Sequence, residues 1–390
     1  MAAVTPLGLA PEIIWRSMRA DQSLTDRGII SATQLAKLHH DAAENAAALG
    51  LAIPGAMAAA ATRPAAKGHS DTPHFILPTM RQLDRSIDLG IIACVQALAN
   101  AGWSAELCKQ KDTALFVATS KGPILRLLEA CEALRTDSDH LSPELAWHVA
   151  LGPAGLQTVL TDILKPGGSV QTLVAACAGS LTAVQHAWSG IQRGEFKRAV
   201  IVAADASIHP IFEHSFENLG VFARPGPDGK RRCRPFAADA DGFFITEAAA
   251  AMCVSAEESP RLTIERCWLG ADATHLLGLD PLGQSLQRGL NACAAGRPVA
   301  FIHAHAAGTQ HDQVELAAIG RACGSAPAVF SHKRWLGHTL GASGLVGLIL
   351  SAVCHEQGLL PTGQSVSRPA RSITIAQGFG GHIGMCVLAG

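Results

Sequence analysis

The chain has 390 residues, of which 48% are hydrophobic and 16% are charged, and its formal net charge at pH 7 is −1. A chain of this length and composition can bury the core of two domains or of one large two-part unit. The near-zero charge argues against nucleic-acid binding driven by overall charge. The longest apolar run, residues 345–354, is much shorter than the roughly 20 residues that cross a bilayer, so we predict no membrane span.

The eleven cysteines are scattered, odd in number and never arranged as C-x-x-C. This pattern is more typical of reduced thiols than of a disulfide framework. The chain also opens without a basic and then apolar leader, which argues against secretion. We therefore expect a cytoplasmic protein.

The first part of the chain predicts a short strand and several helices ahead of a strand–helix–strand block. Helices are expected from about Pro11, within residues 31–66 followed by a loop, over residues 84–102, and after a strand at 114–119 as far as about residue 163. The block itself has a strand at 172–175, a helix, and a second strand at 198–203. In the helix within residues 31–66, the apolar spacing of Leu35, Leu38 and Ala42 suits packing rather than binding.

Strands and helices also alternate in the second part of the chain, after a loop rich in proline, glycine and charge. Two long strands, 243–255 and 261–270, are expected as antiparallel neighbours. Helices are then predicted over 281–295, 312–323 and 341–355, and strands over 299–304, 328–331, 372–376 and 383–388. This alternation predicts an α/β fold, and the similar order of elements predicts two similar halves.

Cys177 lies between the predicted strand and helix of the block, where every residue from 175 to 180 is small. A sharp strand-to-helix turn has no room for large side chains and exposes its central residue. The helix N-terminus favours negative charge, so a thiol held there should ionise more readily and become a better nucleophile. The alternative is that Cys177 is a small buried core residue.

Two further clusters, residues 301–312 and 331–347, also follow predicted strands and carry histidines. Because sites in α/β sheets form at the carboxyl ends of strands, one crevice can hold Cys177, His305 and His338. Each residue has a structural alternative. The H-x-H pattern of His303 and His305 also suits metal ligation, His338 can serve as a helix cap, and Lys333 can be a solvated lysine.

Together these motifs resemble those of the elongating β-ketoacyl-[acyl carrier protein] synthases of the thiolase superfamily. The nucleophile turn is matched by residues 176–180, and the NAHGTGT-type motif by residues 303–309 with Asp312 and Glu315 following. The K-x4-GH-x2-GA-x-G motif is matched by residues 333–344, and the GFGG motif by residues 378–381. The resemblance implies a thiolase-like layered αβαβα fold with two similar halves, which we expect at residues 1–235 and 236–390.

The resemblance assigns the chemistry to three side chains. Cys177 would take the acyl chain as a thioester, and His305 and His338 would stabilise the enolate that forms when a malonyl thioester loses carbon dioxide. Two imidazole donors in a dry pocket supply pre-oriented hydrogen bonds to that negative charge. The backbone N–H groups of Cys177 and Phe379 would form the oxyanion hole, and Phe379 would also gate the acyl tunnel.

Supporting roles follow from the same resemblance. Lys333 and Glu247 would form a buried charge network that orients the histidines. Thr309 would hold the phosphopantetheine arm of the substrate, with Gly378 and Gly380 beside it. No metal and no cofactor is implied, because the substrates arrive on the phosphopantetheine arm of an acyl carrier protein.

Some positions depart from the family pattern. Ala307 stands where a threonine is usual, the spacing from His305 to Asp312 is one residue short, and Glu247 lacks its flanking glycines. These departures favour a specialised pathway, such as polyketide, aryl-polyene-like or secondary-lipid synthesis, over housekeeping fatty-acid synthesis. The alternatives are a chain-length-factor-like partner subunit, which usually lacks the nucleophile, and a non-decarboxylating thiolase or acyltransferase, which needs a second cysteine. Cys386 lies in an apolar strand and does not suit that role.

The family also predicts partners. We expect an acyl carrier protein, and either a homodimer or a heterodimer with a related ketosynthase or chain-length-factor subunit. A basic set in the central loop is a candidate docking site for the acidic carrier: Arg224, Lys230, Arg231 and Arg232. The alternative is a merely solvated basic loop.

Overall fold

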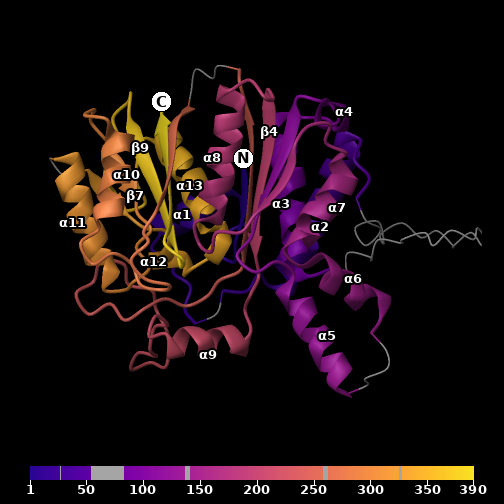
Figure 1. The fold of residues 1–390 in the computed structure, drawn as a ribbon, viewed down its shortest axis with the longest axis horizontal. Coiled ribbons are helices and arrows are strands. Elements are labelled where there is room, and N and C mark those ends of the chain that lie inside the picture. The colour runs from indigo at the N-terminus through magenta and orange to yellow at the C-terminus, as the bar shows by residue number, and fades with distance from the viewer. Residues whose placement is uncertain (27, 54–82, 137–140, 258–261, 325–326) are drawn as a thin grey trace, which may run out of the picture.

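The structure is a computed structural model and describes residues 1–26, 28–53, 83–136, 141–257, 262–324 and 327–390. Two five-stranded sheets form its centre. Figure 1 shows the fold, with helices around these sheets. The loop predicted after the helix within residues 31–66 lies largely outside the described residues. None of the helices in the described ranges is long and apolar enough to cross a bilayer.

The two sheets repeat one topology. The first has the order β1-β5-β4-β2-β3 and the second the order β6-β10-β9-β7-β8, so the strands occur in the same sequence positions in each half. In each sheet the last three strands of that order run parallel, and the first two are antiparallel to their neighbours. The prediction of two similar halves is therefore confirmed.

The strands have the following bounds: β1 Ala2–Val4, β2 Thr113–Ala118, β3 Val170–Leu173, β4 Arg198–Asp205, β5 Ala248–Ser255, β6 Thr263–Ala271, β7 Phe301–His303, β8 Ala328–Phe330, β9 Arg371–Gly378 and β10 His382–Ala389. Strands β2, β4, β5, β9 and β10 are buried along most of their length. Strands β2, β4 and β5 are also largely apolar in sequence, as expected where helices cover both faces of a sheet.

Helices form three layers around the sheets. Between the sheets lie α8 (Gly179–Gln192) and α13 (Ser343–Gln357), each of which contacts strands of both halves. The outer face of the first sheet is covered by α3 (Arg85–Ala101) and α7 (Gly155–Leu164), and α10 (Gln284–Ala294) with α11 (His311–Cys323) lie on the far side of the second. The predicted layered αβαβα architecture is thus confirmed.

The central helices pack closely because small residues face each other. A Cβ at Gly344 would lie 2.7 Å from Leu181 Cγ, and the N–H of Leu345 donates to Ser180 Oγ at 3.0 Å. The small residues at 341–344 therefore allow the two central helices to pack closely. This contact also ties the helix that follows Cys177 to the helix that follows His338.

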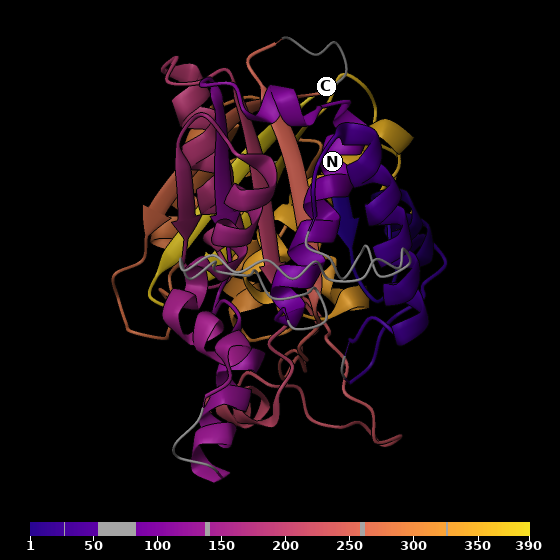
Figure 2. The ribbon, with the colours of Figure 1, turned by 90° about the vertical axis from the view of Figure 1, so that its right-hand side faces the viewer.

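The other helices flank this core: α1 Pro11–Arg19, α2 Ala32–Leu49, α4 Ala105–Cys108, α5 Ile124–Thr136, α6 Pro143–Leu151, α9 Pro210–Asn218 and α12 Lys333–Leu336. Two short 3-10 turns, Gly152–Ala154 and Leu340–Ala342, complete the list. Helix α9 was not predicted. In Figures 1 and 2, α5 and α9 both extend from the same end of the molecule.

One predicted pairing is wrong. Strands β5 and β6 are not neighbours, because β5 pairs with β4 and β1 while β6 pairs with β10. Two long strands that are close in sequence suggest a hairpin, but here they belong to different sheets. The last strand of the first sheet in sequence ends at Ser255, and the first strand of the second begins at Thr263. The domain boundary expected after residue 235 stays a prediction.

Candidate active site

A cavity of about 530 Å³ lies where strands of both halves end. Its lining brings together residues that are far apart in sequence: Cys177, His305, Thr309, His338, Gly378 and Phe379. The prediction that one crevice holds Cys177, His305 and His338 is therefore confirmed. Lys333 lies behind this wall and is almost fully buried.

Cys177 sits in a tight turn directly before α8. Ala176 has a φ of 46°, a conformation that side chains rarely adopt, and the N–H of Ala178 donates to Ala175 O at 3.0 Å. The opposite half closes over this turn, because a Cβ at Gly378 would lie 2.9 Å from Ala175 O and 3.0 Å from the nitrogen of Cys177. Only glycine lets the two backbones approach so closely.

The acidity of the thiol differs from the prediction. Burial raises the pKa of Cys177 to about 11, while the cations Lys121 and Lys333 lower it only in part and Asp205 raises it further. The expectation of a readily ionised thiol is thus wrong for the free protein. The structure places the sulfur in a poorly hydrated site, and desolvation of the thiolate outweighs the nearby positive charge.

Both histidines present the same ring nitrogen to the cavity. The Nδ1 of His305 accepts the N–H of Gln377 at 3.2 Å, and the Nδ1 of His338 accepts the N–H of Leu340 at 3.1 Å. A neutral imidazole that accepts at Nδ1 carries its proton on Nε2. Each ring is therefore held as an Nε2–H donor.

The two rings remain neutral at physiological pH. Burial lowers the pKa of His305 and of His338 well below the ordinary value of 6.5, and the charge of Lys333 lowers both further. Their ring centroids are 5.5 Å apart. The arrangement offers two uncharged hydrogen-bond donors to one acceptor, as an enolate or carbonyl oxygen requires.

Lys333 is the cation behind the histidines, and its acidic partner is not the predicted one. Its Nζ donates to the backbone oxygen of His305 and lies 3.5 Å from the ring Nδ1. Glu315 accepts the N–H groups of His305 and Ala306 at 2.8 Å each, and the charge of Lys333 acts on it. Burial raises the pKa of Glu315 to about 7. The charge network around His305 therefore consists of Lys333 and Glu315.

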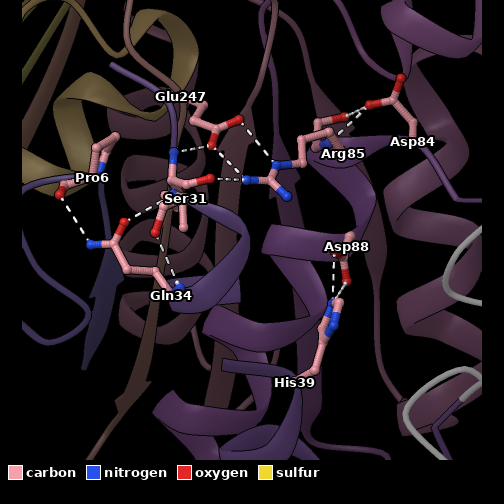
Figure 3. A network of polar contacts seen from close by, with 10 residues as sticks. Pro6, Ser31, Gln34, His39, Asp84, Arg85, Asp88 and Glu247 are labelled. Carbon is pink, nitrogen blue, oxygen red and sulfur yellow. Dashed lines mark hydrogen bonds and ion pairs between the residues drawn. The ribbon is translucent and has the colours of Figure 1, made fainter. Parts of the chain in front are cut away.

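Glu247 belongs to a different network, which Figure 3 shows. It pairs with the guanidinium of Arg85 at 2.8 Å and accepts the N–H of Ile30. This ion pair joins α3 to the residue before β5, and the hydrogen bonds of Ile30 add the segment before α2. The predicted pairing of Glu247 with Lys333 is wrong, and the role of Glu247 in this structure is to hold α2 and α3 against the first sheet.

Asp312 shapes the loop that carries Thr309. Its carboxylate accepts the N–H groups of Ala307 and Gly308 at 3.0 Å each, and also that of Phe236 at 3.0 Å. The loop closes on the carboxylate despite the shortened spacing from His305. Thr309 remains on the cavity wall, and Gly380 follows Phe379 in a turn with φ 81°.

The H-x-H histidines have separate partners. The Oγ of Ser351 donates to Gly347 O at 2.8 Å, so it accepts from His303 Nδ1 at 3.1 Å, which leaves His303 Nε2 to accept from His332 Nδ1 at 2.8 Å. His303 thus faces a buried hydrogen-bond chain, and His305 faces the cavity. Within the described ranges no three His, Cys, Asp or Glu side chains gather to hold a metal ion.

Sequence reasoning missed two residues at the end of the first sheet. Lys121 lines the cavity, with its ammonium 5.1 Å and 5.6 Å from the ring centres of Phe212 and Phe216. Asp205, fully buried, accepts from Ser120 N at 3.0 Å and from Gly341 N at 2.7 Å. It joins the ends of β2 and β4 to the loop after His338. Lys121 follows the apolar strand β2, and Asp205 is the last residue of the apolar strand β4. A charged residue at the end of an apolar strand was the sequence signal that could have identified them.

Two of the four basic residues of the central loop are engaged in ion pairs. Arg231 pairs with Glu217 at 2.9 Å and Arg232 with Asp228 at 2.5 Å. Arg224 and Lys230 are exposed, and Arg224 also lines the mouth of the cavity. Arg224 and Lys230 are thus the members of the docking set that form no ion pair with another described residue.

The topology and the site define the class of protein: a two-half, thiolase-like fold with a cysteine and two histidines in a shared cavity. Sequence comparison identifies the family. Residues 1–259 match the beta-ketoacyl synthase N-terminal domain and residues 280–367 match the beta-ketoacyl synthase C-terminal domain. The chain belongs to the beta-ketoacyl synthase family.

Relatives and solved structures that resemble this chain carry synthase or ketosynthase names as well. A polyketide beta-ketoacyl synthase of Streptomyces halstedii is 26% identical over 80% of this chain and 83% of its own length. The 3-oxoacyl-[acyl-carrier-protein] synthase 2 of Mycobacterium leprae is 31% identical over 49% of each chain. A ketosynthase in complex with its chain length factor from Xenorhabdus doucetiae superposes with a TM-score of 0.76 at 19% identity, covering 100% of this chain and 96% of that one.

Proposed function

We propose that the protein is a β-ketoacyl-[acyl carrier protein] synthase, which takes an acyl group on Cys177 and condenses it with a malonyl thioester. The observation that carries the proposal is the pair of neutral Nε2–H donors, His305 and His338, in the cavity that Cys177 lines. Such donors suit an oxygen that gains negative charge during the reaction.

The first step is acyl transfer. The Cys177 sulfur attacks the carbonyl of the acyl thioester, the oxyanion collapses, and the carrier thiol leaves with the proton that the cysteine loses. The N–H groups of Cys177 and Phe379 form the oxyanion hole, which the close approach of Gly378 to the Cys177 nitrogen supports. Because the free thiol has a pKa of about 11, the proton leaves as the bond forms rather than beforehand.

The second step forms the carbon–carbon bond. The malonyl thioester loses carbon dioxide, and its electron pair becomes an enolate whose oxygen accepts from the Nε2–H groups of His305 and His338. The enolate carbon attacks the acyl carbonyl on Cys177, and the thiolate leaves. Lys333 and Glu315 keep His305 in place from behind. Thr309 and Gly380 flank the arm that carries the substrates, and the reaction needs no further cofactor.

Phe379 is suited to gate the acyl path. Its ring lies 6.4 Å from that of Phe216, which in turn lies 5.3 Å from Phe243. The three rings form an apolar wall beside Cys177. A chain that entered between them would require Phe379 to turn aside, which is how a gate for acyl groups would operate.

An acyl carrier protein and a second ketosynthase-type subunit are the proposed partners. A structural neighbour is an acyl-carrier protein bound to its ketosynthase, with a TM-score of 0.75 at 17% identity. Strand β3 is an edge strand, and Val174 directly after it is 52% exposed. This edge, next to the nucleophile turn, is where we place a homodimer or heterodimer contact. Arg224 and Lys230 are the cations left for an acidic carrier.

A chain-length-factor-like role is the second candidate, favoured by the Streptomyces polyketide synthase relatives and by neighbours that pair a ketosynthase with a chain length factor. The retained cysteine and histidines favour catalysis. The thiolase alternative lacks support, because Cys386 is buried in β10 with its sulfur 3.6 Å from that of Cys267.

The test is reconstitution with acyl-loaded and malonyl-loaded carrier proteins, with mass spectrometry of the carrier-bound product. We expect a β-ketoacyl group two carbons longer than the starter, with release of carbon dioxide, and none of it with Cys177→Ala. If the wild-type protein condenses nothing alone, yet changes the chain length made by an active ketosynthase partner, the catalytic proposal fails and the chain-length-factor role stands.

A further inference from the structure

Lys121 places an ammonium group in the wall of the cavity. The same cavity is lined by the apolar side chains of Phe216, Phe243, Phe379 and Leu340. Its Nζ donates to Ser120 Oγ at 3.3 Å and lies over the rings of Phe212 and Phe216. A cation–π contact holds the charge in place but leaves hydrogen-bond donors of the ammonium without an oxygen partner.

The carboxylates near the cavity are already engaged elsewhere. Asp205 accepts from Ser120 and Gly341, Asp312 and Glu315 accept backbone N–H groups, and Asp241 pairs with Arg234 at 3.5 Å. Within the described part of the chain, Lys121 has no ion-pair partner. Burial raises the pKa of Asp205 and the charge of Lys121, to which Ser120 links it, lowers that pKa in part, but no carboxylate of the described residues forms a direct ion pair with the ammonium. The cavity wall therefore presents an ammonium group on the side of Cys177 that is not directly paired.

A hydrocarbon chain is a poor occupant for this position. An unbroken alkyl chain that covered the ammonium would remove its water without replacing the hydrogen bonds, which is costly for a charged group. An acyl chain with an oxygen acceptor would replace that water. We propose that Lys121 is a specificity residue that selects acyl groups carrying a carboxylate or carbonyl oxygen beyond the thioester.

This inference rests on the proposed function only where it concerns the acyl substrate. The charge itself can be probed without any catalysis. Iodoacetate and iodoacetamide both alkylate a thiol, with the sulfur displacing iodide and the thiol proton passing to solvent, and they differ in one carboxylate. The ratio of their rates at Cys177 therefore reports the attraction of an anion and cancels changes in thiol acidity.

The variant pair for this ratio is Lys121→Met and Lys111→Met. Both lysines flank β2, but Lys111 is exposed at the opposite end of the strand. We expect the iodoacetate-to-iodoacetamide ratio to fall about tenfold in Lys121→Met, to be retained in Lys121→Arg, and to be unchanged in Lys111→Met. An unchanged ratio in Lys121→Met would overturn the proposal.

The substrate class is tested with three five-carbon pantetheine thioesters: pentanoyl, 4-oxopentanoyl and glutaryl. Acyl transfer to Cys177 is followed by intact-protein mass spectrometry under competition. We expect wild-type protein to take one or both oxygen-bearing groups about tenfold over pentanoyl, and Lys121→Met to lose that preference; the group that wins shows which oxygen is recognised. Equal loading of all three groups by wild-type protein would overturn the proposal that Lys121 selects the acyl group. A defect of Lys121→Met that affects only the reaction with the malonyl thioester would overturn it as well. Loading of no group at all sinks the proposed function instead, and the alkylation ratio then decides whether Lys121 attracts anions.

Discussion

The two halves of the molecule share one strand order, and yet their carboxyl edges carry different chemistry. In the first half the strands end at Lys121, Cys177 and Asp205, which supply a nucleophile and its charges. In the second half they end at His305, His338 and the turn with Phe379. The comparison teaches that one scaffold presents two faces to a single cavity: a covalent acceptor on one side and neutral hydrogen-bond donors on the other.

The equivalent connections β3–α8 and β8–α13 differ in length, and this explains the difference in chemistry. The first is a tight turn in which Ala176 takes a φ of 46° and one side chain, Cys177, reaches the cavity. The second contains α12 and a 3-10 turn, which gives room for Lys333 to pass behind the wall and for His338 to stand in it. The longer β8–α13 connection thus positions Lys333 and His338, whereas the shorter β3–α8 turn positions Cys177.

The largest expected effect separates the two faces by removing the nucleophile. Cys177→Ala should lower acyl loading by at least about 1,000-fold, because no other cysteine of the described residues lines the cavity to form the thioester. Malonyl decarboxylation should persist, since the histidines remain. Both rates are measured with purified carriers, and Cys131→Ala, an exposed cysteine on α5, is the matched control. Loss of malonyl decarboxylation together with acyl loading in Cys177→Ala would show that the nucleophile and the histidines do not act independently.

The reciprocal variant removes a donor. His338→Ala should lower malonyl decarboxylation by about 100-fold while acyl loading of Cys177 continues. His338→Gln, whose amide N–H stands near the position of Nε2, should retain more activity than the alanine variant. Equal activity of the alanine and glutamine variants would contradict the assignment of His338 as an Nε2–H donor.

Most of the fold could be predicted from the sequence, because strands and helices alternate strongly and the small-residue turns are local signals. The pairing of β5 with β6 was mispredicted because sheet membership depends on contacts between distant segments. The cavity residues Cys177, His305 and His338 were predicted from motifs at strand ends. The burial of these side chains and the identity of their hydrogen-bond partners could not be predicted from the sequence. The raised pKa of the Cys177 thiol and the role of Glu315 therefore became visible only in the structure.

A smaller effect distinguishes the two acidic residues. Glu315→Gln should lower condensation about tenfold, since each carboxylate oxygen accepts one backbone N–H of the segment that carries His305, and the amide replaces one of these acceptors with an NH2 donor. Glu247→Gln should instead lower the unfolding free energy by about 2 kcal/mol through the Arg85 ion pair, with the remaining folded enzyme active. Turnover per folded molecule and urea unfolding are the two measurements. If Glu247→Gln lowered turnover per folded molecule and Glu315→Gln lowered only the unfolding free energy, Glu247 would belong to the active site.

The smallest effect concerns the buried histidine chain and pH. Burial lowers the pKa of His303 from 6.5 to about 3. Below pH 6.5 the unfolded chain binds a proton that folded His303 does not, so stability is lost as pH falls toward 3. His303→Asn should reduce this pH slope of the unfolding free energy by about 1 kcal/mol per pH unit between roughly pH 5.5 and 4.5. His40→Asn, on the surface of α2, is the control; an equal slope in wild type and His303→Asn would show that His303 is protonated in the folded state.

The most direct test of the shared cavity is a chase experiment on acyl-loaded protein. Cys177 is first acylated, the adduct is located by peptide mass spectrometry, and malonyl carrier is then added. The adduct should disappear from Cys177 as the β-ketoacyl product appears, and it should persist at Cys177 in both His305→Ala and His338→Ala. An adduct on another cysteine, or a chase that proceeds equally fast without either histidine, would contradict the account.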